Sequence, residues 1–131
     1  MDVLVPVRYP LTDRDRRALD RAADLAADPA STVLVFHMNP VHLGTRVTRD
    51  DLREAVGERL ADVNADYAVR SGARIEDTLS EAVERYGVDV VVLTRHPRRP
   101  LAGALLERLD LDVDVVEHLR EHVPVDLVVV E

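Results

Sequence analysis

Hydrophobic residues along the chain fall into five short runs separated by segments with a helical spacing. We predict strands over residues 3–7, 32–36, 67–69, 88–93 and 125–130. The first, second and fourth runs are rich in Val and nearly unbroken, which is typical of strands covered on both faces. The third run is weak, because only three residues carry it.

Between these runs, apolar residues recur every three or four positions, as on one face of a helix. Thr12 and Thr48 each precede such a segment, with an aspartate three residues later, which is the pattern of a capping box. The first helix is predicted to end before Pro29 and the second to continue to Val63. The two helices should therefore begin in the same way.

A third helix is predicted over residues 75–86, with Gly87 as its C-cap. Residues 101–123 are predicted as helix, break and helix, because alternation at 109–113 interrupts the helical pattern. Strands and helices then alternate along residues 1–131, without a linker. This order predicts one α/β domain, a five-stranded doubly wound parallel sheet with helices on both faces.

Composition narrows the chemistry. The 131 residues include no Cys, no Trp and one Phe, so the core must be aliphatic and neither disulfides nor cysteine zinc sites are available. No stretch approaches the roughly 20 apolar residues that span a bilayer, and the start has no basic region. We expect a cytoplasmic protein without membrane contact.

The charge is unusual: 16 Asp and 9 Glu stand against 17 Arg and no Lys, for a net charge of −8. Binding to nucleic acid by bulk attraction is disfavoured. At about 1 M salt the Debye length falls to about 3 Å, so dense like charge repels itself much less. We therefore predict a salt-adapted, halophilic cytoplasm. Codon bias alone would exchange Lys for Arg but would not favour Asp over Glu.

Doubly wound sheets bind ligands beyond the carboxyl ends of their strands, at the point where the strand order reverses. Here that edge follows the first and fourth strands. The candidate ligand-binding residues there are Arg8, Tyr9, Thr94, Arg95, His96 and Arg98. Arginine forks suit carboxylates and phosphates, so the candidate ligand is a small anion. The more common alternative is that these arginines are solvated surface charges.

Other chemistry has little support. His118 and His122 have the i, i+4 spacing of two metal ligands on a helix, but no third ligand follows, and we predict no metal site. No serine lies in a Gly-x-Ser-x-Gly context. We therefore predict no catalytic residues and no enzymatic activity, with weak ATP hydrolysis as the least favoured alternative.

Three segments resemble the universal stress protein (UspA) family: residues 3–7, residues 75–93 and the closing residues 123–130. The resemblance extends over nearly the whole chain. It implies a universal stress-type fold, similar to the adenine nucleotide alpha hydrolases, and a role in the stress response. It also implies a homodimer formed by the last strand.

Many members of that family bind ATP through Gly-x2-Gly-x9-Gly-Ser/Thr after the fourth strand. The four corresponding positions here are Thr94, Pro97, Glu107 and Arg108, so every one is changed. Pro97 has no amide to donate, and Glu107 would place a carboxylate beside a polyphosphate. Arg8 also replaces the acidic residue that commonly ends the first strand. The sequence predicts that ATP is not bound and that no cofactor is needed.

The last strand is the candidate dimer strand, since an exposed apolar edge is adhesive unless something covers it. Its residues are Val125, Leu127, Val128, Val129 and Val130. The alternative is an edge covered by the preceding helix. Together these features predict a dimeric, non-nucleotide-binding regulatory module with an unidentified protein partner. The alternative is a sensor that binds a nucleotide or another small anionic metabolite.

Overall fold

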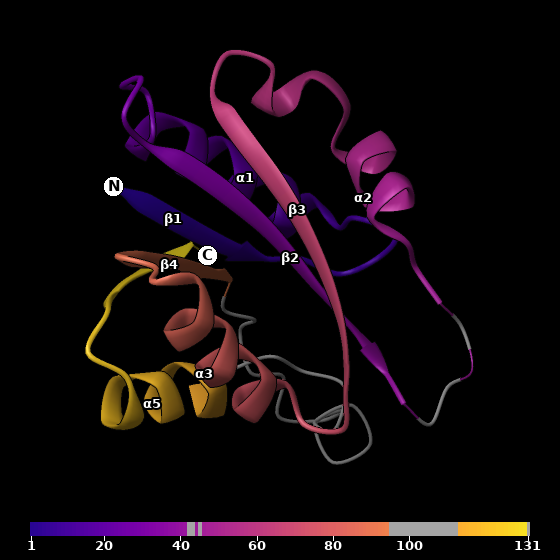
Figure 1. Cartoon of the computed structure of the whole chain (residues 1–131), viewed down its shortest axis with the longest axis vertical. Helices are drawn as coiled ribbons and strands as arrows, with labels where there is room; N and C mark the ends of the chain where they lie inside the picture. Colours follow the sequence, from indigo (N-terminus) through magenta and orange to yellow (C-terminus); the bar gives the residue numbers. More distant parts are fainter. Residues whose placement is uncertain (42–43, 45, 95–112, 131) are drawn as a thin grey trace, which may run out of the picture.

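A computed structural model describes residues 1–41, 44, 46–94 and 113–130. Five parallel strands form one sheet in the order β3-β2-β1-β4-β5 (Figure 1). The strands are β1 (Asp2–Pro6), β2 (Thr32–Pro40), β3 (Asn64–Gly72), β4 (Val90–Thr94) and β5 (Asp126–Val130). The strand order reverses between β1 and β4, so the predicted doubly wound parallel sheet is confirmed.

The helices of the described residues follow the strands in alternation. They are α1 (Asp13–Leu25), α2 (Arg49–Val56), the 3-10 helix η1 (Gly57–Leu60), α3 (Ile75–Tyr86) and α5 (Val113–His122). Both predicted capping boxes are present: Thr12 accepts a hydrogen bond from the Asp15 amide, and Thr48 accepts one from the Asp51 amide. No helix in these ranges is long and apolar enough to cross a membrane.

Two hydrophobic layers lie on the two faces of the sheet. Helices α1 and α2 cover one face, where the fully buried side chains include Val3, Val5, Leu19, Val33, Val35 and Leu52. Helices α3 and α5 cover the other face, where they include Leu4, Phe36, Leu79, Val91, Val116 and Leu119. The predicted aliphatic core is therefore present on both faces.

The second helix is shorter than predicted. It ends at Val56, because Gly57 takes φ 60° and ψ −130°, and the chain continues as one turn of 3-10 helix to Leu60. A positive φ is accessible to glycine at little cost, so Gly57 redirects the chain where the apolar spacing continued unbroken. The predicted continuous helix to Val63 is wrong.

Two strands are longer than predicted. β2 and β3 pair along nine residues each, from Thr32 opposite Asn64 to Pro40 opposite Gly72. The extended ends carry polar side chains, which hid them from a search for apolar runs. Of the region predicted as helix, break and helix, residues 113–122 are helical, and residues 101–112 lie outside the described residues.

Candidate functional site

The turn from β1 into α1 lies at the carboxyl edge of the sheet and is built around one buried carboxylate. The Asp15 side chain is only 2% exposed. Its Oδ2 accepts hydrogen bonds from the amides of Arg8, at 3.2 Å, and Thr12, at 3.0 Å. The helix cap and the strand end are thus joined through a single side chain, which positions the backbone at Arg8.

Arg8 is half-buried in this turn. Its Nη2 atom is buried and has no hydrogen-bond partner among the described residues. A buried guanidinium nitrogen without an acceptor is costly, so it favours any anion that can reach it.

Tyr9 is 43% exposed, and its ring meets the ring of His37 edge-on, with centroids 6.4 Å apart. His37 lies in β2 and is buried, with Nδ1 2.9 Å from the carbonyl oxygen of Val7. Because a carbonyl oxygen only accepts, Nδ1 carries a proton and donates it to the Val7 carbonyl. The two rings form one wall beside the end of β1.

Asn39 organises the next strand end. Its side-chain amide donates to the carbonyl of Val47 at 2.9 Å and accepts from the Val47 amide at 3.0 Å. This pair of bonds holds the loop before α2 against the end of β2. A small hollow of about 170 Å³ lies alongside, lined by Asn39, Pro40, Val41, Gly44, Arg46 and Ser71.

Thr94 is buried at the end of β4, beside β1 at the switch point. The other predicted ligand residues, Arg95, His96 and Arg98, lie outside the described residues. So do Pro97, Glu107 and Arg108, the remaining changed positions of the ATP motif. The structure therefore brings Arg8, Tyr9 and Thr94 to the same edge and leaves the rest of the predicted site as a prediction.

The histidine pair predicted to lie on one helix face is on α5. The rings of His118 and His122 are stacked with centroids 4.2 Å apart, and His122 Nδ1 lies 2.9 Å from the His118 carbonyl. Asp77 Oδ1 lies 3.9 Å from His118 Nε2. Among the described residues, no cluster of three or more side chains could hold a metal ion.

The candidate dimer strand forms one edge of the sheet. The Asp126 amide donates to the carbonyl of Asp89, the residue before β4, at 3.2 Å. The backbone amides and carbonyls of Asp126, Val128 and Val130 therefore point toward β4. Leu127 and Val129 then direct their amides and carbonyls outward, away from β4. The side chains of residues 127–130 are half-buried, with apolar residues on both faces.

Sequence reasoning missed the structural roles of His37 and Asn39. The strand predicted over residues 32–36 ends before both His37 and Asn39. Their signal was weak, because a polar residue that alternates with apolar neighbours can lie on either side of a strand end. The length of β2 is what brings both residues to the site.

No family model and no curated sequence matches the chain. Solved structures do match it. The universal stress protein UspA from Lactobacillus plantarum superposes with a TM-score of 0.72 at 13% identity, covering 100% of this chain and 97% of that chain. The universal stress protein from Archaeoglobus fulgidus gives 0.68 at 17% identity, covering 100% and 93%.

A universal stress protein crystallised in complex with cAMP also matches, with a TM-score of 0.66 and 22% identity over 100% of this chain and 96% of that chain. The resemblance found in the sequence is thereby confirmed as a shared fold. The five-stranded sheet with order 3-2-1-4-5 is the universal stress protein fold over its full length.

Proposed function

We propose that this protein is a divergent member of the universal stress protein family, acting as a non-catalytic, dimeric regulatory or protein-interaction module in a salt-rich cytoplasm. The shared fold over the whole chain supports the family. The four changed motif positions and Arg8 support a protein that does not use the family's ATP mode. No cofactor is then required.

The observation that carries the dimer is the open edge of β5. Leu127 and Val129 present backbone donors and acceptors outward, between half-buried apolar side chains. The opposite edge, β3, differs: Arg49 donates from Nε to the outward carbonyl of Tyr67 at 2.9 Å. Apolar, unpaired edges tend to pair with another strand, and a two-fold axis would place a second β5 antiparallel to the first.

Proline at the edge tests this proposal directly. Val129→Pro removes an outward amide while leaving the bonds from β5 to β4 intact, since proline is tolerated on edge strands. We expect light scattering after size exclusion to give twice the 14.6 kDa chain mass for the wild type and the monomer mass for Val129→Pro. Circular dichroism checks that the variant is folded.

Val69→Pro is the matched control, because Val69 is also half-buried and also directs its amide outward, but on β3. It should remain dimeric. A dimeric Val129→Pro, or a monomeric wild type at tens of micromolar, would contradict the proposed interface.

A second candidate function, a sensor for a small anion, is favoured by the unpartnered Nη2 of Arg8. One structural relative is crystallised with cAMP, so AMP, cAMP and magnesium ATP are the ligands to add to the same samples. Under the first proposal the melting temperature stays flat at constant salt. Saturable stabilisation that is lost in Arg8→Ala, but kept in the control Arg16→Ala, whose guanidinium pairs with Asp13 at 2.9 Å, would favour the sensor instead.

A further inference from the structure

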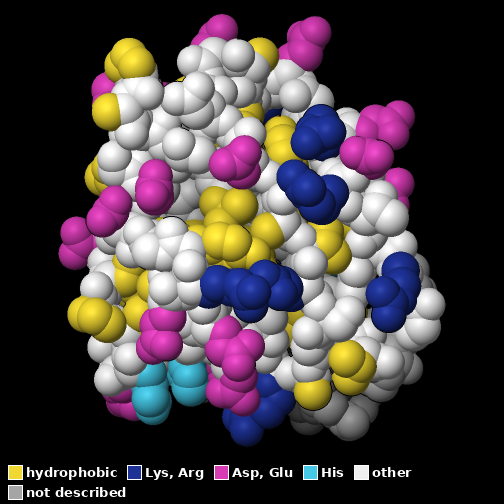
Figure 2. Space-filling view, in the orientation of Figure 1, with side chains coloured by type: hydrophobic (Ala, Val, Ile, Leu, Met, Phe, Trp, Pro, Cys, Tyr) yellow, Lys and Arg dark blue, Asp and Glu magenta, His cyan; other side chains and the backbone are white. Residues whose placement is uncertain are grey.

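A groove of about 520 Å³ opens on the α3 side of the sheet, away from the strand ends that form the crevice. Helices α3 and α5 lie toward the β4 and β5 side of this face, and the groove opens beside α3 over β2 and β3 (Figure 1). Figure 2 shows hydrophobic side chains gathered on this face, with basic side chains along their border. The groove is within the size range of small-molecule sites.

The floor of the groove is apolar. Leu34 of β2 and Ala68 of β3 point to the same face, and Val88 lies beside them in the turn between α3 and β4. Ala68 is small, so its side chain occupies less of the groove than a larger strand residue would. An aliphatic or aromatic body would bury apolar surface here, which favours binding.

One border of the groove is cationic. Arg70 donates from Nε and Nη2 to the hydroxyl oxygen of Tyr86, at 3.4 and 3.2 Å. Since that oxygen accepts from Arg70, the hydroxyl proton of Tyr86 remains available to a ligand. Arg49 also lines the groove, with its Nε on the Tyr67 carbonyl. Neither arginine forms an ion pair with a carboxylate in the described part of the chain.

Carboxylates are available for pairing in a chain of net charge −8. Five other arginines, at positions 16, 53, 59, 74 and 120, form ion pairs with carboxylates within 4 Å. Two guanidinium groups beside one apolar floor are therefore complementary to a ligand that brings its own negative charge.

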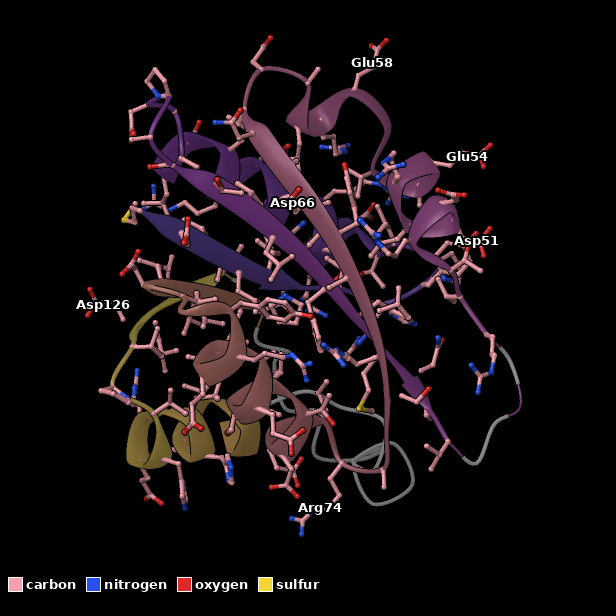
Figure 3. The ribbon with its side chains drawn as sticks, in the orientation of Figure 1. Asp51, Glu54, Glu58, Asp66, Arg74 and Asp126 are labelled. Carbon is pink, nitrogen blue, oxygen red and sulfur yellow. The ribbon has the colours of Figure 1, made fainter. Side chains whose placement is uncertain are left out.

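The acidic side chains of the groove lie at its other end. Asp66 projects from β3 near the start of the strand (Figure 3), and Asp2, at the start of β1, also lines the groove. Asp66 and Arg70 are four residues apart, which is about 13 Å along a strand. This exceeds the Debye length of about 10 Å at 0.1 M salt, so Asp66 only weakly repels a ligand carboxylate that is bound at Arg70.

We propose that this groove binds a small amphipathic carboxylate, with its carboxyl group on Arg70 and Tyr86 and its apolar body on Leu34, Ala68 and Val88. Arg70 and Ala68 are two residues apart, about 7 Å along the strand. That span matches a short arylalkyl or branched-chain acid. A carboxylate fits the planar fork of arginine in a bidentate geometry, which sets it above an uncharged amide.

The probe for this site is 3-phenylpropionate, titrated into the wild type at a single KCl concentration and followed by amide chemical shifts. We expect saturable shifts at Leu34, Ala68, Arg70 and Val88. The uncharged 3-phenylpropionamide, and acetate, which lacks the apolar group, should each bind at least tenfold more weakly. Arg70→Gln should weaken 3-phenylpropionate at least tenfold, and Tyr86→Phe about threefold.

Arg85→Gln is the matched control, because Arg85 lies on α3 next to Tyr86 but is exposed and does not line the groove. It should bind as the wild type does. Three results would each overturn the proposal: chemical shifts that do not saturate, an Arg70→Gln variant that binds 3-phenylpropionate as tightly as the wild type does, or shifts centred on Arg8 and Thr94. The last result would place the acid in the strand-end crevice, whereas nucleotide titration and dimer mass test the proposed function separately.

Discussion

The aspartates of the two capping boxes differ in burial and in the hydrogen bonds that they accept. Asp15 and Asp51 occupy the same position relative to Thr12 and Thr48, and both bonds of each box are present. Asp15, however, is buried and also accepts from the amide of Arg8. The sequence pattern predicted both caps but not this third bond, since it depends on how β1 enters the turn.

The difference predicts unequal costs of removal. Asp51→Ala should lower the free energy of unfolding by about 1 kcal/mol, as the loss of an exposed cap does. Asp15→Ala should cost about 2–3 kcal/mol, because it also leaves the Arg8 amide without an acceptor. Urea denaturation followed by circular dichroism measures both; equal costs would mean that the Arg8 bond contributes little.

Among the strands and helices, the strands that contain apolar runs were predictable from the sequence. The lengths of strands that are extended by pairing with a neighbour were not. β3 shows only a short apolar run, yet it is nine residues long because β2 offers a partner along its whole length. α2 was predicted too long, since periodicity does not register a glycine with positive φ. Gly87, in contrast, was predicted as a C-cap and takes the left-handed conformation at φ 62°.

The start of α3 gives a pH-dependent prediction. Arg74 is its N-cap and makes no side-chain cap bond. Burial acts against ionisation of Glu76, but its backbone amide and the Arg74 guanidinium, 2.7 Å away, hold the pKa of Glu76 below its ordinary value of 4.5. The ionised Glu76 therefore stabilises the folded state above about pH 4.5, and this contribution is lost as the pH falls through the lower folded-state pKa.

We expect Glu76→Gln to lower the free energy of unfolding by about 0.5 kcal/mol at pH 7, as for an exposed ion pair at a helix start, and by less at pH 3.5. The exposed Glu81→Gln on the same helix is the control and should show a smaller difference between the two pH values. A Glu76→Gln cost that is the same at both pH values would rule out this role of the carboxylate.

For the whole molecule, the fold was predictable from the alternation of elements and the acidic surface from the composition. The candidate site was predicted in part, because the rule for doubly wound sheets identified the edge that carries Arg8, Tyr9 and Thr94. The groove beside Arg70 was not predictable, since its residues come from β1, β2, α2, β3, α3 and the turn after α3, far apart in sequence. Only the tertiary structure shows that α3 leaves this part of the sheet uncovered.

The acidic surface predicts a stability that rises with salt. Glu54, Glu58 and Asp126 project from the molecule (Figure 3) and form no ion pair with other described residues. Replacing all three by their amides changes the net charge from −8 to −5 and should reduce the increase in melting temperature between 0.1 and 2 M KCl.

The control replaces three exposed arginines, Arg16, Arg74 and Arg120, by glutamine, which should steepen the same dependence. If both variants show the wild-type slope, salt acts on apolar burial rather than through charge screening.

The contrast between the two sheet edges limits how far association can proceed. On β3 the Arg49 side chain occupies the outward carbonyl of Tyr67, and the Arg53 guanidinium lies 5.3 Å from the centre of the Tyr67 ring. On β5, no hydrogen bond from a described side chain occupies an outward backbone group. A subunit with only one edge strand able to pair has a valency of one, so strand pairing would stop at a dimer. Two such edges would permit an open-ended, continuous sheet of subunits.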